Sequence, residues 1–281
     1  MLELWREAEA VPSVSDDPAG LAGLLETSGD ALLVAEAEGR LVGTIIAGWD
    51  GWRGNLYRLA VLPTARRRGI ALLLVAEAER RLTGKGARRL SALVMSEHDP
   101  AVALWLAAGY HHDHRVGRYV RTLPQPPDPP PGVGELPHPP PDAGVVVRPG
   151  QPEEIPEVLA LWREAGSVPG VSDDPASLER LLETSGDALL VAQVEGRVAG
   201  TIIAGWDGWR GSLYRLAVLP PARRRGIALR LVAEAERRLA AKGARRLSAI
   251  VMSEHDPAVA LWLAAGYHHD ARVSRYIRTL P

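Results

Sequence analysis

The stretch Leu56-Tyr-Arg-Leu-Ala-Val-Leu-Pro-Thr-Ala-Arg-Arg-Arg-Gly-Ile-Ala71 decides the fold of this chain. Its apolar first half predicts a buried strand, its proline a turn, and its Arg-Arg-Arg-Gly segment a loop that opens a long helix. The helix shows in apolar residues at every fourth position, namely Ile70, Leu74, Ala78 and Leu82. Because first-turn amides have no partner inside a helix, the loop offers N–H groups, helix dipole and guanidinium charge to an anion. Gly69 lets a phosphate approach the backbone closely.

Two common phosphate-binding loops are excluded by this sequence. A Walker loop needs a Gly-Lys-Ser or Gly-Lys-Thr ending, and a dinucleotide-binding fold needs G-x-G-x-x-G; neither pattern occurs. What remains is Arg-x-x-Gly-x-Ala, with Val-x-Pro just upstream. This pattern resembles the pyrophosphate loop of the GCN5-related N-acetyltransferase (GNAT) family, which binds acetyl-CoA.

Length and composition set further bounds. The 281 residues are 46% hydrophobic and 24% charged, and the net charge is −1, which argues against nucleic acid or an anionic membrane as the main partner. The chain has no cysteine, so disulfides, thiolate metal sites and acyl-cysteine intermediates are excluded. No signal peptide or membrane span is recognisable. We therefore expect a soluble cytoplasmic protein that uses no metal.

An internal repeat organises the whole chain. Residues 4–124 match residues 161–281 at a fixed offset of 157 without a gap, and 19 of these 121 paired positions differ. The sequence therefore predicts two tandem domains, 1–124 and 144–281. Residues 125–143 between them are Pro-rich and predict a semi-rigid, extended linker.

The complete second copy predicts the element order β-α-α-β-β-β-α-β-α-β-β. Its signals include a hairpin turn at Glu195-Gly-Arg197 and a capped helix start at Ser172-Asp-Asp-Pro175. The order is similar to the whole GNAT fold, so we expect an α/β protein of two acyl-CoA N-acyltransferase domains. The resemblance implies a mixed, mostly antiparallel splayed sheet flanked by helices in each. Together they would form a pseudo-dimer within the chain, and a homodimer of chains is also possible.

The first copy lacks the segment that begins the second. Met1 aligns with Val158, so the first strand and half of the first helix have no counterpart. The strand predicted at 31–37 would then be an open sheet edge. We expect the linker, the other half or a second chain to cover it, and the first copy to be the less stable and less active.

The resemblance implies the residues that bind acetyl-CoA. Backbone groups of the fourth strand would bind pantetheine beside a central splay of the sheet, and the Arg-Gly loop would bind the pyrophosphate. In the first copy these are Leu59, Ala60, Val61, Arg66, Arg67, Arg68, Gly69, Ile70 and Ala71, and in the second Leu216, Ala217, Val218, Arg223, Arg224, Arg225, Gly226, Ile227 and Ala228.

The catalytic residues are less directly indicated. Family members often carry a glutamate on the fourth strand where this chain has Asn55 or Ser212, and a tyrosine where it has Trp105 or Trp262. Indole cannot act as an acid near neutral pH. The alternatives are tyrosines on the same strand face and histidines at the start of the short helix, which could equally be packing and capping residues. The candidates are Tyr57, Tyr214, His98 and His255.

A loop rich in tryptophan and a paired-aspartate turn are candidates for the acceptor side. Exposed tryptophan is costly unless it packs or binds, and carboxylates would attract a cationic amine. The alternative is tryptophan packing and aspartate capping. The residues are Asp16, Asp17, Trp49, Asp50, Trp52 and Arg53, with Asp173, Asp174, Trp206, Asp207, Trp209 and Arg210 in the second copy.

Together these observations predict a tandem N-acetyltransferase. It would transfer an acetyl group from acetyl-CoA to a primary amine of a small molecule or peptide, by direct attack in a ternary complex. One alternative is a non-catalytic acyl-CoA-binding or regulatory protein, favoured by the missing tyrosine and glutamate. Another is a nucleotide-phosphate binder that uses the same helix mouth.

Overall fold

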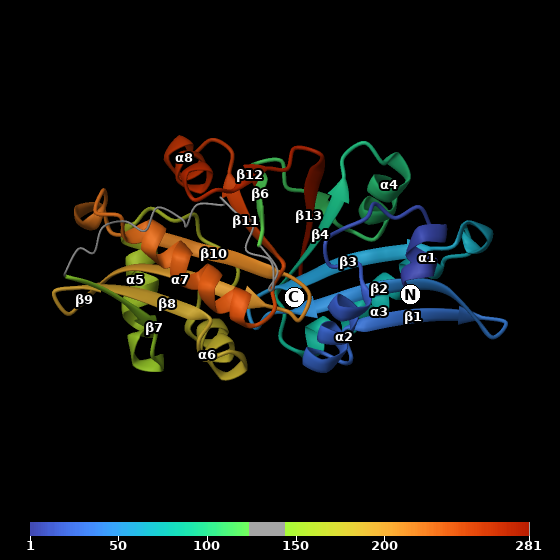
Figure 1. Cartoon of the computed structure of the whole chain (residues 1–281), viewed down its shortest axis with the longest axis horizontal. Coiled ribbons are helices and arrows are strands. Elements are labelled where there is room, and N and C mark those ends of the chain that lie inside the picture. Colours follow the sequence, from blue (N-terminus) through green and yellow to red (C-terminus); the bar gives the residue numbers. More distant parts are fainter. Residues whose placement is uncertain (124–143, 281) are drawn as a thin grey trace, which may run out of the picture.

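A computed structural model describes residues 1–123 and 144–280; the predicted linker lies outside this range. Two halves of similar architecture lie side by side, with the N-terminal half on the right of Figure 1. The sheets are ordered β1-β2-β3-β4-β13-β5 and β12-β6-β11-β10-β9-β8-β7. Within each sheet one pair, β3–β4 or β10–β11, is parallel and the other described pairs are antiparallel. The predicted mixed, mostly antiparallel α/β architecture is confirmed.

The elements of the N-terminal half follow the predicted order from its first helix onward. They are α1 (Leu2–Glu7), α2 (Pro18–Thr27), β1 (Leu32–Ala37), β2 (Arg40–Trp49), β3 (Gly54–Val61), α3 (Ile70–Gly84), β4 (Arg89–Met95), α4 (Asp99–Ala107), β5 (His111–His112) and β6 (Val116–Thr122). The C-terminal half contributes β7 (Val145–Pro149), α5 (Ile155–Glu164), α6 (Pro175–Thr184), β8 (Leu189–Val194), β9 (Arg197–Trp206), β10 (Gly211–Val218), α7 (Ile227–Ala241), β11 (Arg246–Met252), α8 (Asp256–Ala264), β12 (His268–His269) and β13 (Val273–Thr279).

The last strand of each half is exchanged. Strand β6 pairs with β11 of the C-terminal half over seven positions, and β13 pairs with β4 of the N-terminal half over seven. In Figure 1 the green strand β6 lies beside the red β11, and the dark red β13 beside the teal β4. The sequence boundaries at 124 and 144 stay a prediction, but the hydrogen-bonded sheets cross them.

The long helices α3 and α7 pack one apolar face against a sheet. Leu74, Ala78 and Leu82 of α3 are buried as their spacing predicted. The helices begin at Ile70 and Ile227, directly after the Arg-Arg-Arg-Gly loop, which is not helical.

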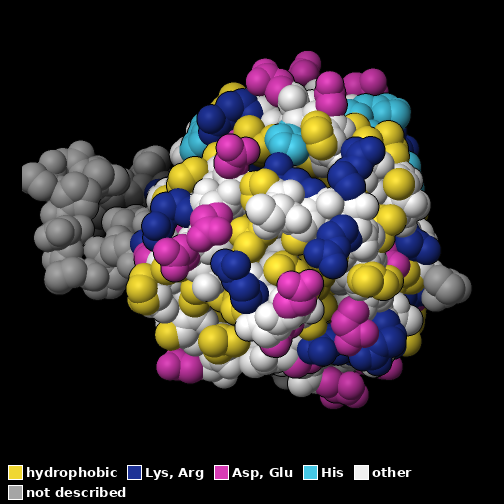
Figure 2. All heavy atoms as spheres, turned by 90° about the vertical axis from the view of Figure 1, so that its right-hand side faces the viewer, with side chains coloured by type: hydrophobic (Ala, Val, Ile, Leu, Met, Phe, Trp, Pro, Cys, Tyr) yellow, Lys and Arg dark blue, Asp and Glu magenta, His cyan; other side chains and the backbone are white. Residues whose placement is uncertain are grey.

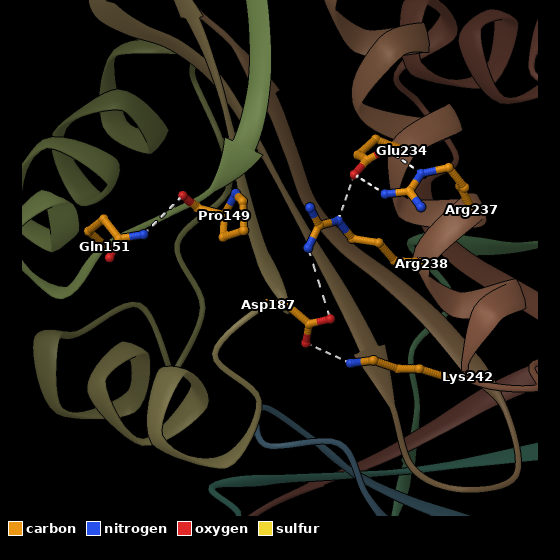
Figure 3. A network of polar contacts seen from close by, with 7 residues as sticks. All are labelled: Pro149, Gln151, Asp187, Glu234, Arg237, Arg238 and Lys242. Atoms are coloured by element: carbon orange, nitrogen blue, oxygen red, sulfur yellow. Dashed lines mark hydrogen bonds and ion pairs between the residues drawn. The ribbon is translucent and has the colours of Figure 1, made fainter.

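The outer face of α7 is fixed by ion pairs, which Figure 3 shows. Glu234 accepts hydrogen bonds from Arg237 and Arg238 at 2.7–2.8 Å. At the end of the helix, Lys242 donates to Asp187 at 2.6 Å, just before β8. The first half repeats the last contact with Lys85 and Asp30. The C-terminal end of each long helix is therefore tied to the segment before β8 or β1.

The outer edge of β1 differs from its counterpart. Strand β8 lies between β7 and β9, whereas no described residue pairs with the outer side of β1. Val34 on β1 is 47% exposed, while the equivalent Val191 is fully buried. The open edge predicted for the first copy is present in the described part of the chain, and its expected cover is not seen there.

Candidate active site

The loop between β3 and α3 forms the predicted helix mouth. A short 3₁₀ turn, Pro63–Ala65, leads into the arginines, and Gly69 takes a left-handed conformation (φ 77°) as the N-cap of α3. No side chain caps this helix, so no side-chain oxygen occupies the first-turn N–H groups. A Cβ atom placed on Gly69 would have no neighbour within 4 Å, so the space in front of it is open. Gly226 caps α7 in the same way.

The three arginines of the loop play different parts. Arg66 donates to the carbonyl oxygens of Val61 and Ala8 at 3.1 and 3.0 Å, so it ties the loop to β3 and to the end of α1. Arg223 makes the equivalent pair of bonds in the second half. Arg67 and Arg68 are exposed. Arg66 and Arg223 therefore hold their loops, and in the first half the exposed Arg67 and Arg68 lie beside the helix mouth, where an anion would bind.

The predicted splay lies directly before this loop. Strand β3 pairs with β4 at three positions, from Gly54 to Leu56, and then the two strands diverge. Arg58, with φ 51°, marks an irregularity where β3 also shifts register against β2. Residues 59–61 consequently have no partner on β4, and among their carbonyl groups that of Val61 accepts the hydrogen bond from Arg66. The equivalent strands β10 and β11 also pair at three positions.

The two candidate tyrosines reach across to the opposite half. The Tyr57 hydroxyl donates to Asp207 Oδ2 at 2.9 Å, and the Tyr214 hydroxyl donates to Asp50 Oδ2 at 2.8 Å. Asn55 Nδ2 donates to the same Asp50 oxygen at 3.1 Å. Burial and the neighbouring carboxylate raise the pKa of Tyr57 well above its usual value. The arrangement thus favours a hydroxyl that stays protonated and donates a hydrogen bond, and it disfavours Tyr57 as a base.

Each aspartate in this network is buried and held by its own loop. Asp207 Oδ1 accepts hydrogen bonds from the backbone N–H groups of Trp209 and Arg210, at 2.9 and 2.7 Å. Burial is nevertheless the larger effect and raises the pKa of Asp207 to about 6. The close approach of the carboxylate requires a glycine opposite, since a Cβ on Gly48 would lie 2.6 Å from Asp207 Oδ2.

Two of the loop tryptophans pack against a helix of the opposite half. Trp52 is 2% exposed and packs edge-on against Trp162 of α5, with 6.0 Å between ring centroids. Trp209 packs equally against Trp5 of α1. Trp49 and Trp206 are half-buried against the core of their own half. Residues that the sequence suggested for the acceptor side thus build the contact between the halves.

The paired aspartates are likewise engaged. Asp17 and Asp174 cap α2 and α6, and each also forms an ion pair across the halves, with Arg245 and Arg88 respectively. Asp16 and Asp173 pair with the arginine that follows the β-strand tyrosine, Arg58 or Arg215. Capping, the alternative reading of this turn, is what the structure shows for Asp17 and Asp174.

The candidate histidines lie at the start of α4 and α8. Nδ1 of His98 accepts a hydrogen bond from the Ala101 N–H at 3.1 Å, and His255 does the same with Ala258. Both side chains are exposed. Each imidazole therefore caps its helix and keeps Nε2 available. Whether it also transfers a proton stays a prediction.

Arginines on the exchanged strands were missed by the sequence analysis. Arg275 on β13 contacts Ser91 and Asp113 of the first half, and Arg118 on β6 contacts Ser248 and Asp270 of the second. Nothing in the local pattern distinguishes a strand that stays in its own sheet from one that leaves it.

The described residues 1–123 and 144–280 include no group of side chains suited to a metal ion and no helix long and apolar enough to cross a membrane. The face drawn in Figure 2 mixes positive, negative and hydrophobic side chains, with no broad basic area.

Comparison with known proteins shows to which family the chain belongs. The model of the acetyltransferase (GNAT) family matches residues 1–110 and again residues 155–267. The chain belongs to the GNAT acetyltransferase family. An acetyltransferase of Photorhabdus laumondii is 42% identical over 108 residues, which cover 38% of this chain and 75% of the relative.

Solved structures show the same fold at lower identity. A tandem GNAT protein of the clavulanic acid biosynthesis pathway, 19% identical, covers 99% of this chain and 93% of its own, with a TM-score of 0.54. A Drosophila protein is 16% identical, and its match covers 100% of this chain and 94% of the Drosophila chain, with a TM-score of 0.57. Membership of the family supports acyl transfer in general.

Proposed function

We propose that this GNAT protein transfers an acetyl group from acetyl-CoA to a primary amine of a small molecule or peptide, in a ternary complex. The observation that supports it most is the pairing, in each half, of a splayed β3–β4 or β10–β11 junction with a glycine-capped helix mouth. These two features would bind the two ends of one long, pyrophosphate-containing cosubstrate.

The reaction needs few groups once the thioester is held. The amine lone pair attacks the thioester carbon, a C–N bond forms, and the carbonyl oxygen takes up negative charge that a strand N–H at the splay can stabilise. The C–S bond then breaks, the amine loses a proton, and the CoA thiolate gains one. Residues 59–61 and 216–218 would hold the pantetheine arm, and Arg67, Arg68 and Arg224 would face the pyrophosphate.

Proton transfer is the open step, and the side chains give two candidates. Nε2 of His98 or His255 is available beside the end of β4 or β11. The protonated hydroxyl of Tyr57 or Tyr214 is a donor near the splay. We assign the histidines first, because both tyrosines already donate to a buried aspartate.

A double variant separates capping from chemistry. His98→Asn with His255→Asn keeps a good helix N-cap, so folding and acetyl-CoA binding should persist while turnover falls by at least tenfold. Acetylation of a panel of primary amines, followed by mass spectrometry, reads the result. Full activity in the variant would move the proton-transfer role to the tyrosines, which Tyr57→Phe with Tyr214→Phe would then test.

One observation favours a second function. Trp105, which stands where the family's usual tyrosine would be, is 5% exposed and packs against Tyr110, so it brings no acidic hydroxyl to the site. A non-catalytic acyl-CoA-binding protein would have the same helix mouths. Tight acetyl-CoA binding without acetylation of any amine in the panel would support that function instead.

A further inference from the structure

Two arginines are buried between the halves without a carboxylate partner. Arg53 and Arg210 are 6% and 8% exposed. Each stacks on the tryptophan before it and donates to a serine of the opposite half at 2.7 Å, Ser172 or Ser13. Within the described residues neither forms an ion pair, and Nη1 of Arg210 is buried with no hydrogen-bond partner.

Each of these arginines lies in a cluster of four. Arginine cluster one is Arg58, Arg118, Arg210 and Arg246; arginine cluster two is the equivalent set, Arg53, Arg89, Arg215 and Arg275. Each half of the chain supplies two of the four arginines of cluster one. Its ion-pair partners are the half-buried Asp16 and the buried Asp270. Cluster two likewise has Asp173 and Asp113.

The clusters therefore hold more positive than negative charge away from water. A buried charge is costly unless it is paired and hydrogen-bonded. In cluster one, Nε of Arg118 and Nε of Arg246 are also buried without a partner, and Nε of Arg89 is so in cluster two. Burial and neighbouring guanidinium groups lower the pKa of Arg53 to about 9 and that of Arg210 to about 10. An anion with several acceptor oxygens would satisfy these donors and relieve the repulsion.

The clusters adjoin the place where the acceptor amine must lie. Arg58 follows Tyr57 on β3, at the start of the splay. Asp207 joins the Tyr57 hydroxyl to the backbone N–H of Arg210. Arg118, on the exchanged strand β6 beside β11, interacts electrostatically with Tyr57. The positive charge thus borders the acceptor side of the splay and not the helix mouth, which lies at the far end of β3.

We propose that each arginine cluster binds a carboxylate or phosphate group of the acceptor, so that the acceptor is an amine that also carries an anionic group. This inference rests on the proposed acetyl transfer. It replaces the expectation that acidic side chains attract a purely cationic amine, because Asp50, Asp207, Asp17 and Asp174 are already occupied in the interface. It also gives the exchanged strands a function, since Arg118 on β6 and Arg275 on β13 each contribute one arginine to a cluster.

The anion site is tested without activity. Sodium phosphate and sodium acetate are titrated into the full chain at an ionic strength held constant with sodium chloride, and the Tm is recorded. Saturable stabilisation by several degrees beyond chloride is expected for the natural chain. The Arg53→Met, Arg210→Met double variant should lose this stabilisation. The Arg40→Gln, Arg197→Gln double variant should keep it, because Arg40 and Arg197 are exposed on the hairpins. No stabilisation of the natural chain, or equal stabilisation of the Arg53→Met, Arg210→Met protein, overturns the site.

Calorimetry with phosphate covers the case in which that variant fails to fold. Saturable phosphate binding by the Gly69→Val, Gly226→Val protein, whose helix mouths are blocked, supports the site, and heats no larger than dilution overturn it.

The source of the anion is tested with matched acceptors. α-Amino acids and their amides are compared as acceptors, and kcat/KM should be at least tenfold higher for the acids, mainly through KM. Equal values would overturn the acceptor assignment even if free phosphate binds. If neither class is acetylated although acetyl-CoA binds, the proposed function fails and the acceptor assignment with it, while the Tm titration still decides the anion site.

Discussion

Asp207 and Asp50 carry the contact between the halves at the scale of single residues. Each is buried, accepts two backbone N–H bonds from its own loop, and takes a tyrosine hydroxyl from the other half. These bonds favour the charged form, but burial outweighs them and raises both pKa values. A carboxylate that resists ionisation in the native state makes folding depend on pH.

The predicted sign follows from proton binding. Native Asp207 keeps its proton up to a pKa of about 6, whereas the unfolded chain releases it near 3.8. Between these values the native state binds more protons, so stability falls as pH rises, by roughly 2–3 kcal/mol for this group. Asp207→Asn cannot ionise, so its stability relative to the natural chain should rise by this amount between pH 4 and pH 7.

Urea unfolding of both proteins at pH 4.5 and 7.5 measures the difference. Asp30→Asn is a control of opposite sign, because Lys85 lowers the pKa of the exposed Asp30 carboxyl. A stability difference between Asp207→Asn and the natural chain that does not change with pH would contradict the assignment.

At the scale of elements, the sequence predicted those features of the fold that depend on local residue patterns. The helix mouth and the β-hairpins follow from proline, glycine and apolar periodicity, whereas the splay was implied by the resemblance to the GNAT family; all three occur where expected. The exchange of β6 and β13 could not be predicted, because the two copies are nearly identical. Val116–Thr122 and Val273–Thr279 offer almost the same side chains to either sheet, so no local pattern selects the partner. The burial of Trp52 and Asp50 in the opposite half was missed for the same reason.

The open edge of β1 leads to a prediction on the same scale. Strand β8 is hydrogen-bonded on both sides and β1 on one. Outward N–H groups of β1 should therefore exchange with solvent deuterium well before those of β8. Mass spectrometry of peptides covering 32–37 and 189–194 compares two nearly identical sequences. Equal, slow exchange would show that the linker or a second chain covers the edge.

At the scale of the whole molecule, the exchanged strands interlock the two halves. Each sheet would lose an internal strand if the halves separated, and the tryptophan loops would be exposed. A protease site inserted between residues 125 and 143 tests this. After complete cleavage the two fragments should still elute together from a sizing column in the absence of denaturant. Fragments that separate as two folded domains would show that each copy keeps its own last strand.

The central claim is that each half binds one acetyl-CoA at its glycine-capped helix mouth. Calorimetric titration of acetyl-CoA measures it most directly. The natural chain should bind two molecules, Gly69→Val or Gly226→Val one, and the double variant none, because the added side chain fills the space in front of the first-turn amides. Gly39→Val and Gly196→Val are matched controls with the same left-handed backbone on distant hairpins, and they should still bind two. Unchanged stoichiometry in the Gly69→Val, Gly226→Val double variant would contradict the account.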